Sequence, residues 1–551
     1  MAIVENKPVE TTILLCGGKI NYIDLPVGTN VSNSMVPVNG KPVIAWIIED
    51  LISKKITNIT IVLRKENNRL FSFLDRVYSD RTTLKFVFLH LEGNIINSLH
   101  AGLSENDNDG IVRVILGDTL IRDSFTENFN FVYTAPVTDS RRWCLVSFDN
   151  NKRITQYFDK QSGLEPPYNA IAGYYHFLNG KLLNNCVTDS IKQKEKELSD
   201  VLTRYGRNEP IYAKTVSDWY DFGNIDRLIE AKQKLLKPRY FNSLSINQTL
   251  GTITKFSKNN QKLKDELDWY QNIPEPLKVL TPRILHYEPQ NNEVQIVQEY
   301  YGYPTLAELY VYGEFHSDTW ISILNRVMAI HKEFLKYSGS LNEEYIQEMY
   351  SKKIFLRLKE AGKQDNSWRE ILSAQELMFN NKNLIGIPGL RNFINQISEK
   401  LAKTTSTTVI HGDFCFSNIL FDINNQIIRL IDPRGRFGKK GIYGDPRYDI
   451  AKLRHSVHEY YDYIVADMFD CYEKNGEFYG GIYKNGSNSE IIRRFDEMIL
   501  SLGYNLDEIK FIEGLLFISM LPLHHDNNKR QKMMFFTGLK LLNGVYYALS
   551  D

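Results

Sequence analysis

Residues 409–435 read VIHGDFCFSNILFDINNQIIRLIDPRG, and this stretch decides the fold of the second half of the chain. An apolar pair precedes His411-Gly412-Asp413, and Asn418 opens an apolar run a few positions later. The polar turn 424–426 leads into a second apolar run that ends at Asp432. Two such runs joined by a short polar turn predict a β-hairpin. We therefore expect Asp413 and Asn418 on a tight loop, and Asp432 at the end of the next strand.

The three polar side chains of this stretch match the needs of phosphoryl transfer from ATP. A carboxylate must deprotonate or orient the acceptor hydroxyl, while an amide oxygen and a second carboxylate hold Mg²⁺ against the phosphates. We predict that Asp413 is the catalytic base and that Asn418 and Asp432 are the metal ligands. The alternative is a turn in which Asp and Asn bond only their own backbone. The complete spacing of the three residues favours the catalytic interpretation.

The segments HGDFCFSN and IDPRG resemble the catalytic and metal-binding segments of the aminoglycoside phosphotransferase and choline kinase family. This resemblance implies an α+β, protein-kinase-like fold with two lobes, which phosphorylates a hydroxyl group of a small molecule. Many members of that family carry an aromatic or acidic residue after the metal-binding aspartate, where this chain has Pro433-Arg434-Gly435. The departure bears on the choice of acceptor and leaves the carboxylate of Asp432 in place.

Length and composition limit the possible classes of protein. The 551 residues are too many for one core and enough for about three to four domains. Lys and Arg number 66, as do Asp and Glu, so no global field draws the chain to nucleic acid or to an anionic membrane. We see no apolar run long enough for a membrane span and no signal peptide pattern. The five scattered cysteines predict neither disulfides nor a zinc site, so we expect a cytoplasmic enzyme.

Short apolar runs alternate with helical patterns across residues 1–236, which we assign to the first domain. One run ends at Gly17 and Gly18, and another leads into Asp118. This alternation predicts an α/β domain with a Rossmann-like, mostly parallel sheet. Such sheets bind ligands at the carboxyl ends of their strands, which is where these three residues fall.

The first domain resembles the nucleotidyltransferases that join a nucleoside triphosphate to a sugar phosphate or to phosphocholine. LLCGG at 14–18 matches the start of their glycine loop, and MVPVNGKPV at 35–43 matches the segment after their catalytic lysine. The resemblance implies that the domain binds a nucleotide such as CTP or UTP, and also Mg²⁺. The implied nucleotide-binding residues are Gly17, Gly18 and Lys160, and the implied metal ligands are Asp118 and Asp221.

Two departures from this family remove cations that normally neutralise the triphosphate. The glycine loop continues with Ile20-Asn21-Tyr22 in place of Gly-Thr-Arg, and Ser32-Asn33 stand where the family has Pro-Lys. Loss of one such cation commonly costs orders of magnitude in rate. Lys19, Lys41 and Lys160 are the candidate replacements. Without a replacement, the domain would bind a nucleotide or sugar phosphate and not turn it over.

We assign residues 237–551 to the second domain, with a small lobe at about 240–302 and a helical lobe at about 303–551. Lys255 lies on a predicted strand and Glu266 on a predicted helix. These are the places of the kinase lysine that grips the α- and β-phosphates and of the glutamate that orients it. Resemblance at the hinge implies that adenine meets the backbone of Gln298, Glu299 and Tyr300. Asp445 and Asp449 are either helix caps or functional acids.

Two such domains in one chain suggest successive steps toward an activated precursor of a bacterial surface polysaccharide, such as capsule, lipopolysaccharide or teichoic acid. The second domain would phosphorylate a sugar, polyol or amino alcohol, and the first would transfer a nucleotidyl group to the phosphate ester. The pathway rests on family analogy alone. One alternative is a kinase with a degenerate first domain, and another is a non-catalytic nucleotide-binding scaffold. The acceptor, the nucleotide and the oligomeric state stay open.

Overall fold

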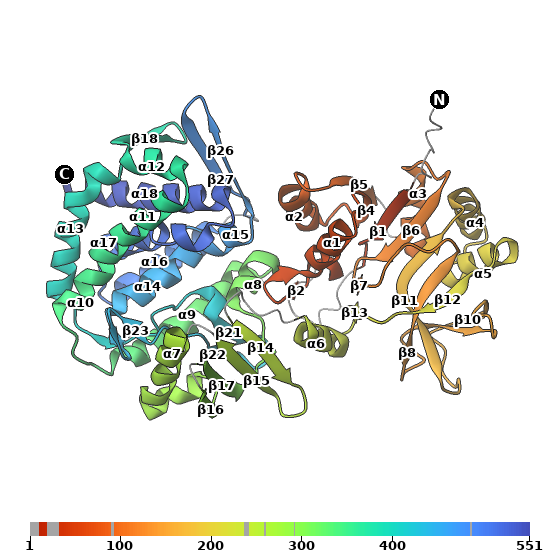
Figure 1. Cartoon of the computed structure of the whole chain (residues 1–551), viewed down its shortest axis with the longest axis horizontal. Coiled ribbons are helices and arrows are strands. Elements are labelled where there is room, and N and C mark those ends of the chain that lie inside the picture. Colours follow the sequence, from red (N-terminus) through yellow and green to blue (C-terminus); the bar gives the residue numbers. More distant parts are fainter. Residues whose placement is uncertain are drawn as a thin grey trace. The chain divides into compact units, whose positions relative to one another are not determined.

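The computed structural model describes residues 10–18, 32–89, 93–235, 242–257, 260–290, 293–484 and 488–550. The chain divides into two compact units, which Figure 1 colours from red to yellow and from green to blue. Unit 1 comprises Met1–Leu235 together with Tyr312–Glu314, and unit 2 comprises Leu236–Val311 together with Phe315–Asp551. No helix among the described residues is both long enough and apolar enough to cross a membrane.

Unit 1 is built on a nine-stranded sheet in the order β10-β9-β11-β6-β1-β4-β5, with β8 paired to β11 and β12 paired to β8. The strands are β1 (Glu10–Leu15), β4 (Asn58–Arg64), β5 (Thr83–Leu89), β6 (Ile111–Leu116), β8 (Phe131–Val137), β9 (Cys144–Phe148), β10 (Ile154–Asp159), β11 (Tyr168–Phe177) and β12 (Tyr212–Thr215).

The sheet of unit 1 is mixed, which corrects the prediction of a mostly parallel sheet. The strands β6, β1, β4 and β5 are parallel neighbours, whereas β11 is antiparallel to β6, β8 and β9. The connections between these strands differ in whether they contain a helix. Helices separate β1, β4, β5 and β6 along the chain, but none lies between β6 and β11. Parallel neighbours are usually joined by a helical crossover, and β11, which is reached without one, pairs in the antiparallel direction.

Helices cover this sheet and complete the core of unit 1. Apolar side chains of α3, α4 and α5 pack with those of β1, β6 and β11 in one buried cluster. The helix α3 begins at a capping box, in which the side chains of Asn94 and Asn97 each bind the backbone N–H of the other. The helices are α1 (Val43–Ser53), α2 (Asn68–Tyr78), α3 (Ile95–Ser104), α4 (Gly180–Lys192), α5 (Leu198–Asn208) and α6 (Ile225–Lys234).

Unit 2 begins with a small antiparallel sheet in the order β14-β15-β17-β16. The helix α7 (Asn260–Asn272) packs Leu263 and Leu267 against Val294 and Ile296 of this sheet. The strands are β14 (Asn242–Asn247), β15 (Thr252–Ser257), β16 (Ile284–Gln290) and β17 (Glu293–Glu299). The packing fixes α7 beside β15 and β17, and therefore sets the positions of side chains that point between the sheet and the helix.

The remainder of unit 2 is mostly helical, as the periodicity predicts (Figure 1). The helices are α8 (Leu306–Tyr312), α9 (Ser317–Leu335), α10 (Glu343–Gln347), α11 (Lys353–Gln364), α12 (Asn366–Ser373), α13 (Ile387–Thr404), α14 (Pro446–Val457), α15 (Tyr461–Val465), α16 (Ser489–Ser501), α17 (Leu506–Ile518) and α18 (Asn528–Ser550). A further sheet, β19-β18-β27-β26, was not predicted. Its strands are β18 (Glu376–Phe379), β19 (Lys382–Ile385), β26 (Phe469–Lys474) and β27 (Glu477–Ile482).

The predicted hairpin within 409–435 is present. The strands β21 (Ile419–Asp422) and β22 (Ile427–Leu430) pair in the antiparallel direction. The carboxylate of Asp422 accepts hydrogen bonds from the backbone N–H groups of Asn424 and Asn425, which closes the turn. The loop before β21 carries Asp413, and Asp432 lies two residues after the end of β22.

Candidate active sites

The loop before β21 places Asp413 and Asn418 against each other. The side-chain amide of Asn418 donates to the backbone oxygen of Asp413 at 2.9 Å and to Oδ2 of Asp413 at 3.0 Å. Lys452 of α14 lies 2.8 Å from the other carboxylate oxygen. Burial alone would raise the pKa of Asp413, but the Lys452 ammonium holds it well below its usual range. Asp413 is therefore ionised at neutral pH. Lys452 is a site residue that the sequence analysis missed.

Asp449 on α14 binds the backbone of the loop that carries Asp413. Its two carboxylate oxygens accept the backbone N–H groups of His411 at 2.7 Å and Gly412 at 2.9 Å. Burial raises the pKa of Asp449 to about 7, and the two amides act in the opposite direction. The sequence left a helix cap and a functional acid open for Asp449, and its contacts are instead those of an anchor for the Asp413 loop.

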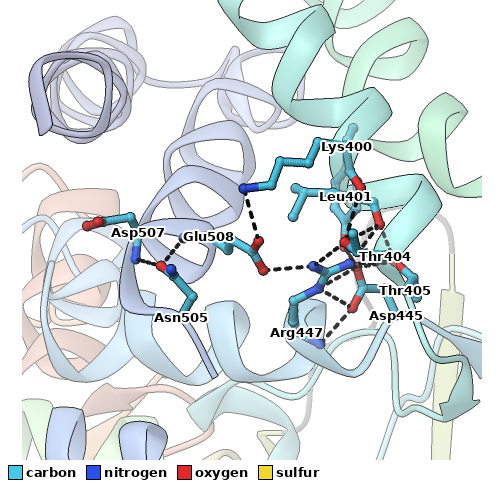
Figure 2. Close-up of polar contacts among 10 residues, drawn as sticks. Lys400, Leu401, Thr404, Thr405, Asp445, Arg447, Asn505, Asp507 and Glu508 are labelled. Carbon is cyan, nitrogen blue, oxygen red and sulfur yellow. Dashed lines mark hydrogen bonds and ion pairs between the residues drawn. The ribbon is translucent and has the colours of Figure 1, made fainter. Parts of the chain in front are cut away.

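The start of α14 is fixed by a buried polar cluster around Arg447, shown in Figure 2. Asp445 accepts the backbone N–H of Arg447 at 2.9 Å and pairs with its guanidinium. The same guanidinium reaches Glu508 of α17 at 2.8 Å and the backbone oxygen of Leu401 of α13 at 2.9 Å. These contacts bind three helices together. Asp445 is thus a helix cap that orients α14, the helix that carries both Asp449 and Lys452.

A second group of charged side chains gathers between the small sheet and α7. The ammonium of Lys255 on β15 lies 2.6 Å from Oε1 of Glu266 on α7 and 2.5 Å from Oδ1 of Asp432. Burial alone would lower the pKa of Lys255, but the Asp432 and Glu266 carboxylates raise it well above its usual value. Asp432 has a φ of +56°, a strained value of the kind that clusters at functional sites. The structure thus brings together three residues that the sequence singled out separately.

Gly435 lets the loop after Asp432 run against α7. A Cβ at this position would lie 1.9 Å from the backbone oxygen of Asp265, and the φ of Gly435 is +60°. Arg436 adds an ion pair to the Asp265 carboxylate at 2.7 Å. The glycine of the IDPRG segment therefore keeps Asp432 close to the helix that carries Glu266.

We expect Gly435→Ala to destabilise unit 2 strongly. Left-handed backbone costs a non-glycine residue about 1–2 kcal/mol, and the clash with Asp265 adds about 1–3 kcal/mol. The matched control is Gly476→Ala, because Gly476 has a φ of +79° and no atom within 4 Å of an added Cβ. Urea unfolding of both variants measures the difference. Equal losses in the free energy of unfolding would show that the loop does not need the close approach of Gly435 to Asp265.

The predicted adenine contacts meet backbone groups that are partly engaged. The N–H of Glu299 donates to the backbone oxygen of Arg283 at 3.1 Å, and the N–H of Tyr300 donates to that of Gly251 at 2.9 Å. Gln298 is buried, and its side-chain oxygen has no hydrogen-bond partner within the described ranges. A base bound at this hinge would therefore need a backbone donor beyond Tyr300, and adenine binding here stays a prediction.

Unit 1 brings its two predicted metal ligands together through a small sheet. The strand β13 (Trp219–Asp221) pairs in the antiparallel direction with β7 (Thr119–Ile121), and Asp221 lies opposite Thr119. Asp118 is the residue before β7, so the two aspartates are neighbours. A Cβ added to Gly223 would lie 3.2 Å from Oδ2 of Asp118 and 3.3 Å from Oδ1 of Asp221.

Asn33 completes this group at the glycine loop. Its side-chain amide donates to Oδ2 of Asp118 at 3.3 Å. Its backbone N–H donates to the oxygen of Gly18 at 3.4 Å, so Gly18 and Asp118 are linked through one residue. The backbone oxygen of Gly17 accepts the Nε–H of Arg64 at 2.7 Å. Arg64 ends the neighbouring strand β4, and a basic residue at that strand end was a signal that the sequence analysis overlooked.

The acidic pair of unit 1 has the electrostatics of a cation site. Burial raises the pKa of Asp118, and burial together with the nearby Asp118 charge raises the pKa of Asp221 to about 7. Oδ2 of Asp221 and Oδ1 of Asn33 are buried without a hydrogen-bond partner in the described part of the chain. Two adjacent carboxylates with an unsatisfied oxygen fit Mg²⁺, which often takes one or two protein carboxylates and completes its shell with phosphate and water oxygens.

Of the lysines considered as replacement cations, the two that the structure describes make no ion pair with Asp118 or Asp221. Lys41 is engaged by Glu49 and lies 3.9 Å from the centre of the Trp46 ring. Lys160 is exposed on the loop after β10 and, within the residues that the structure describes, makes no ion pair with either aspartate. Lys19 and the segment 20–22 lie outside the described residues. Nucleotide binding by Lys160 stays a prediction.

Comparison with known proteins confirms the resemblance of the first unit. The family model described as nucleotidyl transferase matches residues 11–238. The bifunctional protein GlmU of Methanocaldococcus jannaschii is 26% identical over 231 residues, which cover 41% of this chain and 54% of that protein. The low-salt glycan biosynthesis nucleotidyltransferase Agl11 of Haloferax volcanii is 24% identical over 248 residues, which cover 41% of this chain and 66% of that protein. The chain spans about half the length of the GlmU relatives that it matches.

Solved structures of nucleotide-sugar enzymes are also similar to part of the chain. A putative glucose-1-phosphate thymidylyltransferase from Bacillus anthracis is 22% identical, with 41% of this chain and 94% of that chain covered and a TM-score of 0.35. A UDP-glucose pyrophosphorylase from Acinetobacter baumanii is 15% identical, with coverage of 41% and 93% and a TM-score of 0.36.

Proposed function

We propose that the protein is a bifunctional transferase. Unit 2 would transfer the γ-phosphoryl group of ATP to a hydroxyl of a small molecule, and unit 1 would transfer a nucleotidyl group to a sugar phosphate or a similar phosphate ester. The first step is supported chiefly by the Lys255 ammonium, which joins Glu266 to Asp432 in unit 2. The second is supported by the nucleotidyl transferase match and by the buried pair of Asp118 and Asp221.

In unit 2, each residue has a distinct task. Lys255, held charged by its two carboxylates, would bind the nucleotide phosphates. Asn418 commits its NH₂ group to Asp413, so its oxygen is available to a metal, and Asp432 would be the second ligand. Bound Mg²⁺ would neutralise charge on the transferring phosphoryl group.

Asp413 would accept a hydrogen bond from the acceptor hydroxyl and aim its oxygen at the γ-phosphorus. The new O–P bond forms as the bond from the γ-phosphorus to the bridging oxygen breaks, ADP leaves, and the hydroxyl proton passes to Asp413 or to water. The ion pair with Lys452 lowers the basicity of Asp413, which favours orientation of the hydroxyl over early removal of its proton.

In unit 1, Asp118 and Asp221 would hold Mg²⁺, which polarises the α-phosphate of the nucleotide when it is bound. An oxygen of the phosphate ester forms the new bond to the α-phosphorus, and pyrophosphate leaves. Gly17 and Gly18 would let the nucleotide approach the backbone, and Arg64 places a cation at this loop. The glycan biosynthesis named for Agl11 supports a role in making a glycan precursor, which we place in bacterial surface polysaccharide by analogy.

A second candidate function is a kinase whose first unit binds a nucleotide or sugar phosphate without turnover. The observation that favours this function is the neutral side chain of Asn33, which contacts Asp118. The nucleotidyltransferases that unit 1 resembles carry a lysine at this position. Activity of unit 1 with supplied phosphate esters decides between the two.

Phosphorus NMR of the full chain tests both steps. The protein is mixed with Mg²⁺, ATP, CTP or UTP, and a panel of sugars, polyols and amino alcohols. The proposal expects a new phosphomonoester signal, followed by a pyrophosphate diester. A second reaction without ATP, but with supplied sugar phosphates and phosphocholine, tests unit 1 alone. A phosphomonoester that never becomes a diester in either reaction would support the kinase with a degenerate first unit.

Replacing Lys255 by Met should lower kcat/KM for ATP in the kinase reaction by about 10- to 150-fold. This corresponds to the loss of one charge-assisted contact of about 1.5–3 kcal/mol. The control is Lys336→Met, which removes an exposed ion pair with Glu333. Initial rates at varied ATP concentration measure the effect. An unchanged kcat/KM for ATP would remove Lys255 from the phosphate site.

A further inference from the structure

Three basic side chains act on Asp413, and a fourth interacts electrostatically with two of them. Lys452 is its ion-pair partner, while Lys353 and Arg357 lie one turn apart on α11. Arg434 lies two residues after Asp432, the proposed metal ligand, and also acts on the Asp413 carboxylate. Lys353 interacts electrostatically with all three of the other cations and with Asp413. Basic groups therefore outnumber the carboxylates that act on Lys353 and Arg357, which are Asp413 and Glu360 respectively.

The fold holds these cations in place. The backbone N–H of Arg434 donates to the oxygen of His411 at 2.9 Å, and a Cβ at Gly412 would lie 2.8 Å from Cβ of Arg434. The Arg434 guanidinium donates to the Tyr448 hydroxyl at 2.8 Å. The Arg357 guanidinium donates to the backbone oxygen of Ser519 at 2.7 Å. The guanidinium groups are thus positioned by neutral oxygens.

No carboxylate of the described residues lies within 4 Å of the charged nitrogens of Lys353, Arg357 or Arg434. All three side chains are partly buried. Burial and the neighbouring cations lower the pKa of Lys353 well below its usual value, and burial lowers that of Arg357. A partly buried set of like charges is unfavourable unless an anion joins it. Such a set, beside the proposed catalytic carboxylate, fits a negatively charged ligand.

The cation proposed to bind the phosphates of ATP in unit 2 is Lys255. Lys255 contacts Asp432, whereas Lys452, Arg434 and Lys353 act on Asp413, the residue proposed to face the acceptor hydroxyl. Resting on the phosphotransferase function proposed above, we propose that the acceptor is an anion. It would be a small hydroxylated molecule with a carboxylate or phosphate group, which Lys353, Arg357 and Arg434 bind while Asp413 engages the hydroxyl. Planar guanidinium groups suit both kinds of anion, and the same charges repel an amino alcohol such as choline.

The test compares acceptors that share a carbon skeleton and carry a neutral, anionic or cationic substituent. Glycerol, glycerate, glycerol 3-phosphate and 3-amino-1,2-propanediol form one set, and glucose, glucuronate, glucose 6-phosphate and glucosamine form another. Acceptor-dependent release of ADP by the full chain gives kcat/KM for each. We expect an anionic member to exceed its neutral partner at least about 10-fold, and the carboxylate and phosphate arms identify the anion. Preferred use of a neutral or cationic member would overturn the inference and leave the kinase function intact.

Two variants connect the preference to these residues. Lys353→Met and Arg434→Met should raise the acceptor KM and lower the ratio of anionic to neutral kcat/KM about 10-fold, with the KM for ATP unchanged. Lys439→Met removes an exposed lysine of the same unit and should leave the ratio unchanged. A rise in the KM for ATP alone would assign the cations to the nucleotide and overturn the proposal.

If no member of either set is phosphorylated, binding of inorganic phosphate to the ADP-loaded protein tests whether the anion site exists. Phosphorus line broadening should be strong for the wild type and for Lys439→Met, and weak for Lys353→Met and Arg434→Met. Equal broadening in all four proteins would overturn the anion site. If no acceptor leads to release of ADP, but phosphate binds in the expected pattern, the result would count against the proposed phosphotransferase and not against the anion site.

Discussion

Replacing Asp413 by Asn is expected to lower ATP-dependent phosphorylation of the acceptor by about 10²- to 10⁴-fold, the usual range for loss of a positioned proton acceptor. The amide keeps the shape of the side chain, but it cannot take the hydroxyl proton and it removes the ion pair with Lys452. Release of ADP in the presence of the acceptor measures the loss. Nucleotidyl transfer by unit 1 should continue at the rate of the unaltered protein, which provides an internal check of folding.

The matched control is Asp470→Asn, because Asp470 is exposed on β26 and bonds only the Tyr483 hydroxyl among described contacts. Asp413→Asn also leaves Lys452 buried without its partner. The double variant Asp413→Asn/Lys452→Met should therefore regain thermal stability and remain inactive, since replacing both members of a buried pair is far less costly than removing one. Full kinase activity of Asp413→Asn with a true acceptor would remove this residue from the reaction.

The parts of the proposed phosphotransferase site that the sequence predicts are those set by local spacing. The turn at 424–426 and its flanking apolar runs specify the hairpin, and with it the placement of Asp413, Asn418 and Asp432. Lys452 and Lys353 could not be found in this way, because each comes from a helix that only tertiary packing brings to the loop. Nothing in the local sequence around either lysine distinguishes it from a surface residue.

Two further differences have the same origin in long-range pairing. The sheet of unit 1 becomes antiparallel at β11, which the chain reaches through a run of strands without a crossover helix. At the hinge, the N–H groups of Glu299 and Tyr300 bond Arg283 and Gly251, which are distant in the chain. Spacing along one strand predicts its direction and burial, but it does not reveal which of its backbone groups a neighbouring segment already uses.

Asp118→Asn and Asp221→Asn should each lower nucleotidyl transfer by more than about 10²-fold, while ATP-dependent phosphorylation in unit 2 is spared. Removing a residue that is hydrogen-bonded to a metal ligand commonly lowers metal affinity or activity about 10- to 100-fold. Removal of the ligand itself should lower activity further. Release of pyrophosphate from CTP or UTP with a supplied sugar phosphate measures the effect. A rate like that of the unaltered protein would place the metal site elsewhere.

Thermal unfolding without Mg²⁺ distinguishes a metal site from a structural role for these two residues. Burial raises the pKa of both carboxyl groups, and the Asp118 charge adds to the shift of Asp221, so the ionised pair disfavours the folded state. Either substitution removes one of two neighbouring charges, and the variants should unfold at an equal or higher temperature than the unaltered protein. The control Asp75→Asn, on the surface of α2, should change neither activity nor stability. Two carboxylates that repel each other as metal ligands stabilise the fold less when both are charged, so neutralising one should not lower the unfolding temperature. A variant that lost activity and also unfolded at a lower temperature would therefore show that the pair supports the fold.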